Sequence, residues 1–154
     1  MDEITGRAKA TLEGVRMIRP TEARSYLTAS RWMAAGAFHN FSGPIDCAIA
    51  GASQIAQSLE CVLKAYLSFS GLSKGKLMDP SLRHNLEALW TLAADNGLKV
   101  DPLPSGWCKL LNTAHNNPFF FRYPMGLNGM VTPPPLEMEQ GLRDILQLVE
   151  AQIR

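Results

Sequence analysis

The residues most able to do chemistry in this 154-residue chain are three histidines and a scattered set of cations. His39, His84 and His115 lie in separate segments, and no C-x-x-C pattern, H-E-x-x-H pattern or paired-carboxylate helix accompanies them. The G-x-S-x-G elbow and the G-x-x-x-x-G-K-[ST] phosphate loop are also absent from the sequence. We therefore expect no metal ion and no cofactor, and we find no motif of a known catalytic centre.

Charged residues are concentrated in and after one expected helix. Glu60 and Lys64 are four apart, in the order that favours an ion pair on a helix surface. Exposed pairs of this kind contribute little, so the residues alone favour a solvated face. The basic residues that follow within twenty positions could hold phosphates together with Lys64; they are Lys74, Lys76, Arg83 and His84. The competing interpretation is an ordinary solvated loop, since short charged runs are common on surfaces.

Arg122 follows three consecutive phenylalanines and precedes Tyr123. A guanidinium among aromatic rings can stack on a nucleic-acid base or clamp a phosphate. It can equally pin its loop to a helix C-terminus or to a carboxylate. The residues leave both roles open. Because the aromatic run is too apolar for a free linker, we expect the segment 118–135 to pack on the rest of the protein.

Composition indicates a single globular domain of ordinary charge. Hydrophobic residues make up 46% of the chain, charged residues 19%, and the formal net charge is +1. A dedicated nucleic-acid binder is usually far more basic, so any such contact would need a local patch. Cys47 and Cys61, fourteen residues apart on one expected helix, would lie about 21 Å apart and cannot pair. With no signal peptide or transmembrane run expected, we predict a cytoplasmic protein that does not enter a membrane.

Apolar positions recur with helical spacing along most of the chain and predict an all-α protein. The longest expected helix, 45–69, would span about 37 Å and form the centre of the fold, with Pro44 in its first turn and Gly71 as its C-terminal cap. The other main helices are expected at 21–39, at 80–96 and from the proline run at 133–135 to the C-terminus, with a short helix at 105–115. We expect an antiparallel up-and-down bundle domain over 21–154, an exposed mobile connection after residue 70, and an N-terminal extension over 1–20 with or without a short helix.

Several polar positions give the chain a resemblance to the HEPN domains, small helical bundles of prokaryotic toxin–antitoxin pairs and phage defence. One run is A-x-x-x-x-Q-x-x-E-x-x-x-K, which includes Glu60 and Lys64, and another is H-N-L-x-x-L, which begins at His84 and Asn85. The FFFRYP segment around Arg122 is similar to a stretch that precedes the last helix in some members. The resemblance implies a homodimeric helical bundle. It also implies a protein partner such as a nucleotidyltransferase, or RNA.

Many HEPN proteins are metal-independent ribonucleases that carry an Arg followed after four to six residues by a His. This sequence departs from that pattern, because no histidine follows Arg122. Lys109 and His115 have a suitable spacing, but a lysine stands where the arginine would be. The favoured hypothesis is therefore a non-catalytic binding module. Two alternatives stay open: a ribonuclease with a displaced site, for which Lys109, His115 and Arg122 are the catalytic candidates, and a plain interaction bundle that does not contact nucleic acid.

The resemblance also suggests roles for individual residues. His84 is expected to be buried against the central helix and hydrogen-bonded to Glu60 or to backbone, with ligand binding as the alternative. Trp32 falls off the apolar stripe of its helix, among small residues. It and the aromatic residues of the 118–125 loop are expected in the dimer interface, although a Trp lying over the edge of the bundle would fit the sequence as well.

Overall fold

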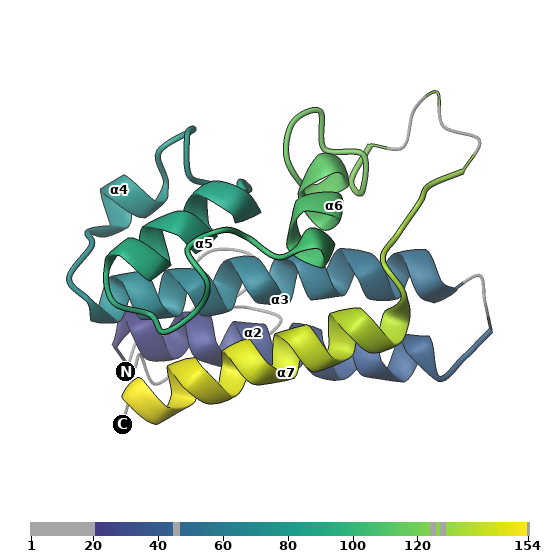
Figure 1. Ribbon diagram of the computed structural model, residues 1–154. Helices are drawn as coiled ribbons and strands as arrows, with labels where there is room; N and C mark the ends of the chain where they lie inside the picture. The colour runs from purple at the N-terminus through teal and green to yellow at the C-terminus, as the bar shows by residue number, and fades with distance from the viewer. Residues whose placement is uncertain (1–20, 45–46, 124–125, 127–128, 154) are drawn as a thin grey trace, which may run out of the picture.

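The computed structural model describes residues 21–44, 47–123, 126 and 129–153, and all the regular structure in these residues is helical. The described helices, in chain order, are α2 (Glu22–Phe41), α3 (Ala48–Phe69), α4 (Lys74–Leu77), α5 (Leu86–Asp95), α6 (Gly106–His115) and α7 (Pro135–Gln152) (Figure 1). The predicted all-α class is confirmed. The extension expected over residues 1–20 lies outside the described residues.

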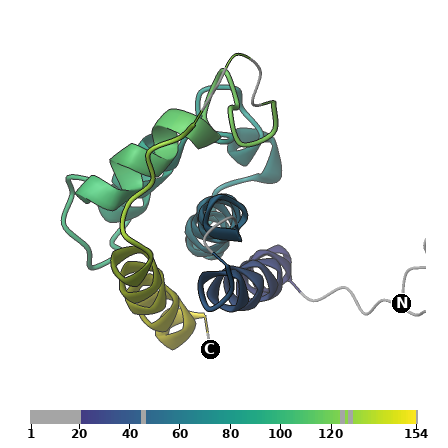
Figure 2. The ribbon, with the colours of Figure 1, turned by 90° about the vertical axis from the view of Figure 1, so that its right-hand side faces the viewer.

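The long helix α3 is the centre of the fold, as its apolar pattern predicts. Figure 2 looks along it and shows α2 and α7 on one side and α4, α5 and α6 on the other. Because neighbours surround α3, its side chains are buried almost continuously from Gly51 to Leu67. α2 and α3 lie side by side and run in opposite directions, whereas the short helix α6 is steeply inclined to α3 (Figure 1).

Small residues allow α2 and α3 to approach closely. The buried face of α2 carries Ala23, Ser30, Ala34 and Ala37 beside a single leucine. The Ser30 hydroxyl lies 2.7 Å from the carbonyl oxygen of Ser58, and the Ser58 hydroxyl lies 2.7 Å from the carbonyl oxygen of Ser30. This reciprocal pair satisfies buried polar atoms of both helices and thereby fixes their register.

The ends of α3 agree only in part with the sequence. The helix begins at Ala48 rather than at residue 45, so Pro44 precedes its first turn. At the other end Gly71 has a φ of +105°, and the amides of Gly71 and Leu72 donate to the carbonyls of Ser68 and Leu67. This is a Schellman motif, in which glycine is favoured because of its left-handed backbone, and the predicted glycine cap is confirmed.

The start of α5 differs from the start predicted from the sequence. The sequence predicts a helix from residue 80 with Asp79 as its N-cap, but the Asp79 carboxylate instead accepts hydrogen bonds from the amide and the hydroxyl of Ser81. Such an Asx turn competes with helix formation. The helix begins at Leu86, and Asn85 caps it by accepting a hydrogen bond from the amide of Ala88 at 3.2 Å.

Two connections agree with their predictions in part. The segment after residue 70 is largely exposed, as expected, but it contains the one-turn helix α4, whose Leu77 is fully buried. In the segment 118–135, expected to pack on the bundle, Phe121 contacts the core, but Tyr123 and Val131 are 63% and 79% exposed.

Among the helices that the structure describes, none is long and apolar enough to span a membrane.

The contact between α6 and α7 gives a test of the packing. A Cβ atom added at Gly141 would lie 2.5 Å from the indole of Trp107, which is itself buried and packed edge-to-face against Trp90. Overpacking of this kind costs about 1–3 kcal/mol, and the better helix propensity of alanine returns at most about 1 kcal/mol. We expect Gly141→Ala to lower the free energy of unfolding by about 1 kcal/mol in urea titrations followed by circular dichroism.

The matched control is Gly75→Ala, because no atom lies within 4 Å of a Cβ added at Gly75. Its stability should equal or exceed that of the wild type. A Gly141→Ala variant as stable as the Gly75→Ala variant would show that α7 does not pack on Trp107 as described.

Candidate functional site

A buried carboxylate lies at the centre of the bundle and binds three other side chains. Glu60 Oε1 accepts a hydrogen bond from Lys64 Nζ at 2.6 Å, and Glu60 Oε2 lies 2.6 Å from His115 Nε2 and 3.1 Å from His84 Nδ1. Glu60, Lys64 and His115 are each less than 8% exposed. We call these four residues the Glu60 cluster.

The members of the Glu60 cluster come from three segments of the chain. Glu60 and Lys64 are one turn apart on α3, and His115 is the last residue of α6. His84 precedes α5 and has a φ of +62°, a left-handed conformation that is uncommon for a residue other than glycine. The cluster therefore joins α3 to the end of α6 and to the turn that precedes α5. It also holds His84 in a backbone conformation that is unfavourable for L-amino acids.

Electrostatics keep the central carboxylate ionised. Burial raises the pKa of Glu60, but the hydrogen bond from His115 and the charge and hydrogen bond of Lys64 together outweigh burial and bring the pKa below its usual value. An ionised carboxylate can only accept hydrogen bonds. The two nitrogens that face it, Nδ1 of His84 and Nε2 of His115, therefore carry protons.

This geometry corrects the expected solvated pair. Lys64 is 5% exposed and its ammonium group is engaged by Glu60, so it does not belong to the surface basic patch in which the sequence analysis placed it. The reason is that α3 is covered on all sides, which leaves no solvated face at this level of the helix. The expected hydrogen bond between His84 and Glu60, in contrast, is present.

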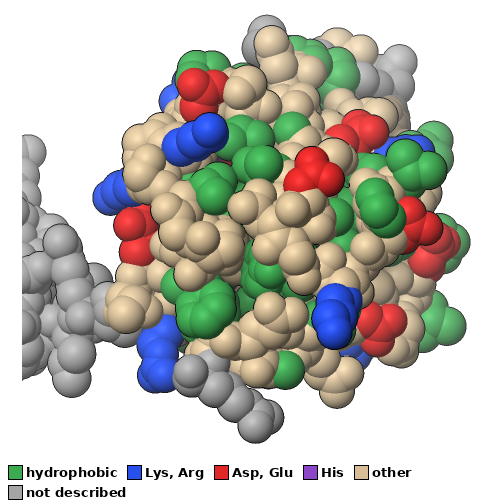
Figure 3. All heavy atoms as spheres, turned by 60° about the vertical axis from the view of Figure 1, so that its left-hand side comes forward, with side chains coloured by type: hydrophobic (Ala, Val, Ile, Leu, Met, Phe, Trp, Pro, Cys, Tyr) green, Lys and Arg blue, Asp and Glu red, His purple; other side chains and the backbone are tan. Residues whose placement is uncertain are grey.

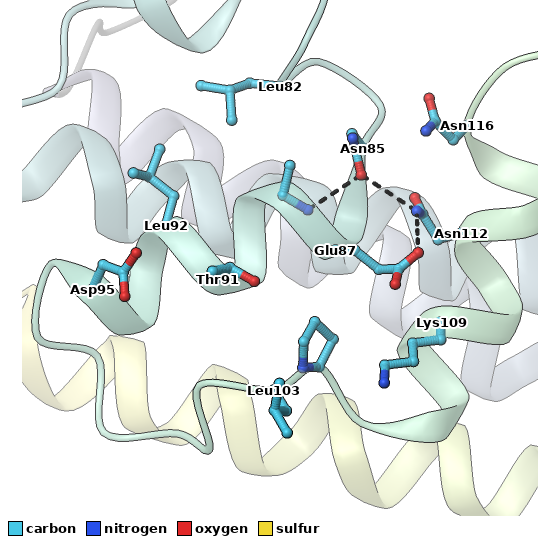
Figure 4. A pocket seen from close by; sticks show the side chains of 12 residues that line it. Leu82, Asn85, Glu87, Thr91, Leu92, Asp95, Leu103, Lys109, Asn112 and Asn116 are labelled. Carbon is cyan, nitrogen blue, oxygen red and sulfur yellow. Dashed lines mark hydrogen bonds between the residues drawn. The ribbon is translucent and has the colours of Figure 1, made fainter.

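A second polar group supports the start of α5. Asn112 of α6 accepts a hydrogen bond from the amide of Leu86 at 2.8 Å, and its own amide group donates to Glu87 at 2.8 Å and to Asn85 at 3.3 Å (Figure 4). A free amide at the N-terminus of α5 is thus satisfied by a side chain of α6. These hydrogen bonds fix His84 and His115 relative to one another, because His84 is adjacent to Asn85 and His115 lies one helical turn after Asn112.

The remaining cations of the predicted patch are at the surface. Lys74, Lys76 and Arg83 are exposed. The His84 ring packs edge-to-face on Phe119 with centroids 5.7 Å apart, which places the turn before α5 beside the turn after α6. Arg122, which is also exposed, lies in that second turn, where its amide donates to the carbonyl of Phe119.

The three catalytic candidates are not brought together. His115 is 5% exposed and faces α3, whereas Lys109 is exposed on another face of the same helix. Arg122 lies beyond the end of α6. A buried imidazole whose Nε2 is held by a carboxylate has no access to a substrate at that nitrogen, so this trio does not form a site for general acid–base catalysis.

Lys109 instead lines a pocket of about 730 Å³ between α5, residues 103–104 and α6. Figure 4 shows Glu87, Asn112 and Lys109 on the α6 side of this pocket and Asp95 toward the far end of α5. Carboxylates and a lysine thus share a surface with Leu92 and Leu103. The pocket is mixed in character and carries no arrangement of nucleophile and base.

Cys61 and Cys108, two of the three cysteines, do not supply a nucleophile either. Burial, together with the charge of Glu60, raises the pKa of Cys61 to about 11. Burial, together with Glu87, raises the pKa of Cys108 to about 12. Both thiols are therefore protonated near neutral pH, and the thiolate that attacks a substrate is scarce.

Comparisons with known proteins add no relative, because no protein-family profile, curated protein or solved structure matches this chain. The site must therefore be judged from its own geometry.

The sequence motifs do not indicate the place of His115 in the cluster or the role of Asn112. Trp107, Cys108, Leu111, Asn112 and His115 all lie on the buried face of α6. The spacing of these residues continues the apolar stripe to His115, so helical periodicity alone could have indicated a buried histidine. It could not have indicated the partner, because Glu60 is 55 residues away. The same geometry makes Glu60, His84 and His115 a group of potential metal ligands, which their separation in the sequence had concealed.

Replacing Glu60 alone should destabilise the protein more than replacing Glu60 and Lys64 together. Glu60→Gln keeps the size of the side chain but leaves the Lys64 ammonium group buried without a countercharge, a change that costs about 3–5 kcal/mol in comparable pairs. In Glu60→Gln/Lys64→Met the charge is gone, and we expect the free energy of unfolding in urea titrations to recover by about 1–3 kcal/mol relative to the single variant.

The exposed pair formed by Arg31 and Glu150 is the control, since Arg31→Gln should cost less than about 1 kcal/mol. If the double variant of the cluster is less stable than Glu60→Gln, the charge of Lys64 is not balanced by Glu60.

Proposed function

We propose that this chain is a divergent HEPN-like module that binds single-stranded RNA and does not cleave it. The four positions matched by the resemblance, Glu60, Lys64, His84 and Asn85, support this proposal because they meet at one place and act on the fold. Glu60, Lys64 and His84 form most of the buried cluster, and Asn85 caps α5. These four residues therefore stabilise the bundle, and a ligand would be bound by other residues at its surface.

The observation that carries the proposal is the contact between His84 and Phe119. It brings together two turns that each bear an exposed arginine, Arg83 and Arg122. Figure 1 shows the turn before α5 and the loop after α6 next to each other, on the same side of α3 as α4. Lys74 and Lys76 of α4 are both exposed. We call the exposed residues of this side the basic face; they are Lys74, Lys76, Arg83, Arg122 and Tyr123.

The chemistry of the basic face suits a single strand. The one acid between Lys74 and Arg83 is Asp79, whose carboxylate is engaged by Ser81. Tyr123 is 63% exposed and offers a ring on which a base can stack. On the face drawn in Figure 3, acidic and basic side chains are interspersed. RNA would therefore be held by the local basic face and not by a field over the whole protein.

Binding should depend on salt and on the basic face. Contacts from four cations to a single strand predict a slope of about −2.8 for log K against log salt concentration, since each contributes about −0.7. In Lys74→Ala/Arg83→Ala we expect the slope to fall to about −1.4 and binding at low salt to weaken about tenfold or more. The measurement is fluorescence anisotropy of a labelled single-stranded RNA in EDTA over a range of salt concentrations.

The charge-matched control is Arg31→Ala/Lys99→Ala, which removes two exposed cations outside the basic face and should bind RNA as the wild type does. Equal weakening in both double variants would indicate a nonspecific charge effect and would contradict the proposal. The absence of RNA binding would favour a protein partner instead. Cleavage of the RNA during the assay, if lost in Lys109→Ala, a catalytic candidate outside the basic face, would replace binding by a ribonuclease activity.

The proposal includes a homodimer, and Trp32 is the residue on which it rests. This side chain of α2 is 72% exposed, and Gly36 lies one turn further along the helix. A large aromatic side chain beside small residues is a suitable interface anchor. We expect a dimer by light scattering at micromolar concentration and a monomer for Trp32→Ser.

The control for this substitution is Leu136→Ser on α7, which removes an apolar side chain that is 78% exposed. It should leave the dimer intact. A wild-type monomer, or a Trp32→Ser variant that remains a dimer, would contradict the role of Trp32.

A further inference from the structure

We propose that Glu60, His84 and His115 form a binding site for a divalent transition-metal ion, for which Zn²⁺ is the probe. One carboxylate oxygen and two imidazole nitrogens, one atom from each residue, all lie within 4.8 Å of one another. Two histidines and one glutamate are a donor set that zinc uses in sites that keep a fourth position open. The inference does not depend on RNA binding.

The distances within the cluster are close to those that zinc requires. Zn–N and Zn–O bonds of about 2.0–2.1 Å place neighbouring donors of a tetrahedral site about 3.3 Å apart. Glu60 Oε2 is 2.6 Å from His115 Nε2 and 3.1 Å from His84 Nδ1. Both distances are shorter than this, so an ion would move Glu60 Oε2 away from His115 Nε2 by about 0.7 Å and away from His84 Nδ1 by about 0.2 Å.

Protons and the ion compete for the same atoms. In the hydrogen-bonded form, His84 Nδ1 and His115 Nε2 carry protons, because Glu60 can only accept. To bind an ion, each neutral imidazole must carry its proton on the other ring nitrogen. No net proton is released if both rings are neutral before and after binding, and the ion takes the place of two hydrogen bonds.

The surroundings provide outer support and access. Glu60 would bind the ion through Oε2 alone while Oε1 keeps its 2.6 Å hydrogen bond from Lys64, the kind of contact that orients a ligating carboxylate. The edge-to-face contact with Phe119 holds the His84 ring. The His84 side chain is 22% exposed, so water can reach this side of the cluster and fill the fourth position.

Lys64 gives the site a diagnostic property. Its ammonium group would lie one carboxylate away from the ion, and two like charges so close reduce affinity. Removing this charge should therefore tighten metal binding, whereas removing a ligand should weaken it. A role of the cluster in the fold alone predicts neither effect on zinc.

The experiment is a calorimetric titration of Zn²⁺ into protein freed of metal by dialysis against a chelator. We expect one ion per chain with micromolar or tighter affinity. His84→Asn, chosen because asparagine tolerates a left-handed backbone, should weaken binding about tenfold or more, and Lys64→Met should strengthen it. His39→Asn is the matched control, since His39 is exposed and belongs to no cluster in the described residues.

Electron paramagnetic resonance of the Cu²⁺-loaded protein adds a readout that does not depend on stability. Hyperfine coupling to two nitrogens is expected in the wild type and to one in His84→Asn. The proposal is overturned if the wild type binds no Zn²⁺, if His84→Asn binds it as tightly as the wild type, or if binding is lost in His39→Asn. Circular dichroism of each variant verifies that it is folded.

Discussion

The structure depends on the burial of one carboxylate in its central helix. A charge at the position of Glu60 is strongly unfavourable unless it is neutralised and hydrogen-bonded, because only a small part of the side chain is exposed to water. Lys64 supplies the charge from the next turn of α3, and two histidines supply hydrogen bonds from elsewhere in the chain. The Glu60 carboxylate needs these hydrogen bonds, and this requirement restricts the positions of the end of α6 and of the turn before α5.

This constraint extends beyond the Glu60 cluster. Once His84 is fixed, Asn85 can cap α5, and Asn112 of α6 can satisfy the amide of Leu86. The same histidine presents its ring to Phe119, which places the turns that carry Arg83 and Arg122 side by side. A polar interaction inside the bundle thus arranges cations on its surface, which links the core to the proposed RNA-binding face.

Helical periodicity was sufficient to predict α2, α3, α6 and α7 and the central place of α3, because these helices bury apolar stripes that repeat every three or four residues. It failed where two local signals compete. Asp79 could cap a helix or close a turn with Ser81, and the choice follows from Asn85 and from Asn112 of α6, the second of which is distant from Asp79 in sequence. The burial of Lys64 could not be predicted from the sequence either. A helix that is covered on all sides has no solvated face, so the spacing of polar residues does not tell which of them are exposed. The contact of His115 with Glu60 spans 55 residues and has no local signature.

Stability alone does not explain why three of these polar side chains, Glu60, Lys64 and His115, occupy the interior. Buried ion pairs are often no more stabilising than apolar side chains of the same volume, so a bundle selected only for stability would gain from leucine or methionine at these positions. The polar set does what apolar side chains cannot, since its directional hydrogen bonds define one register of α3, α6 and the turn at His84. It also gathers three potential metal-ligand atoms within 4.8 Å of one another, beside the partly exposed side chain of His84. Both properties come from the same geometry, and the charge of Lys64 decides the balance between them, because it stabilises the hydrogen-bonded carboxylate and opposes the entry of a cation.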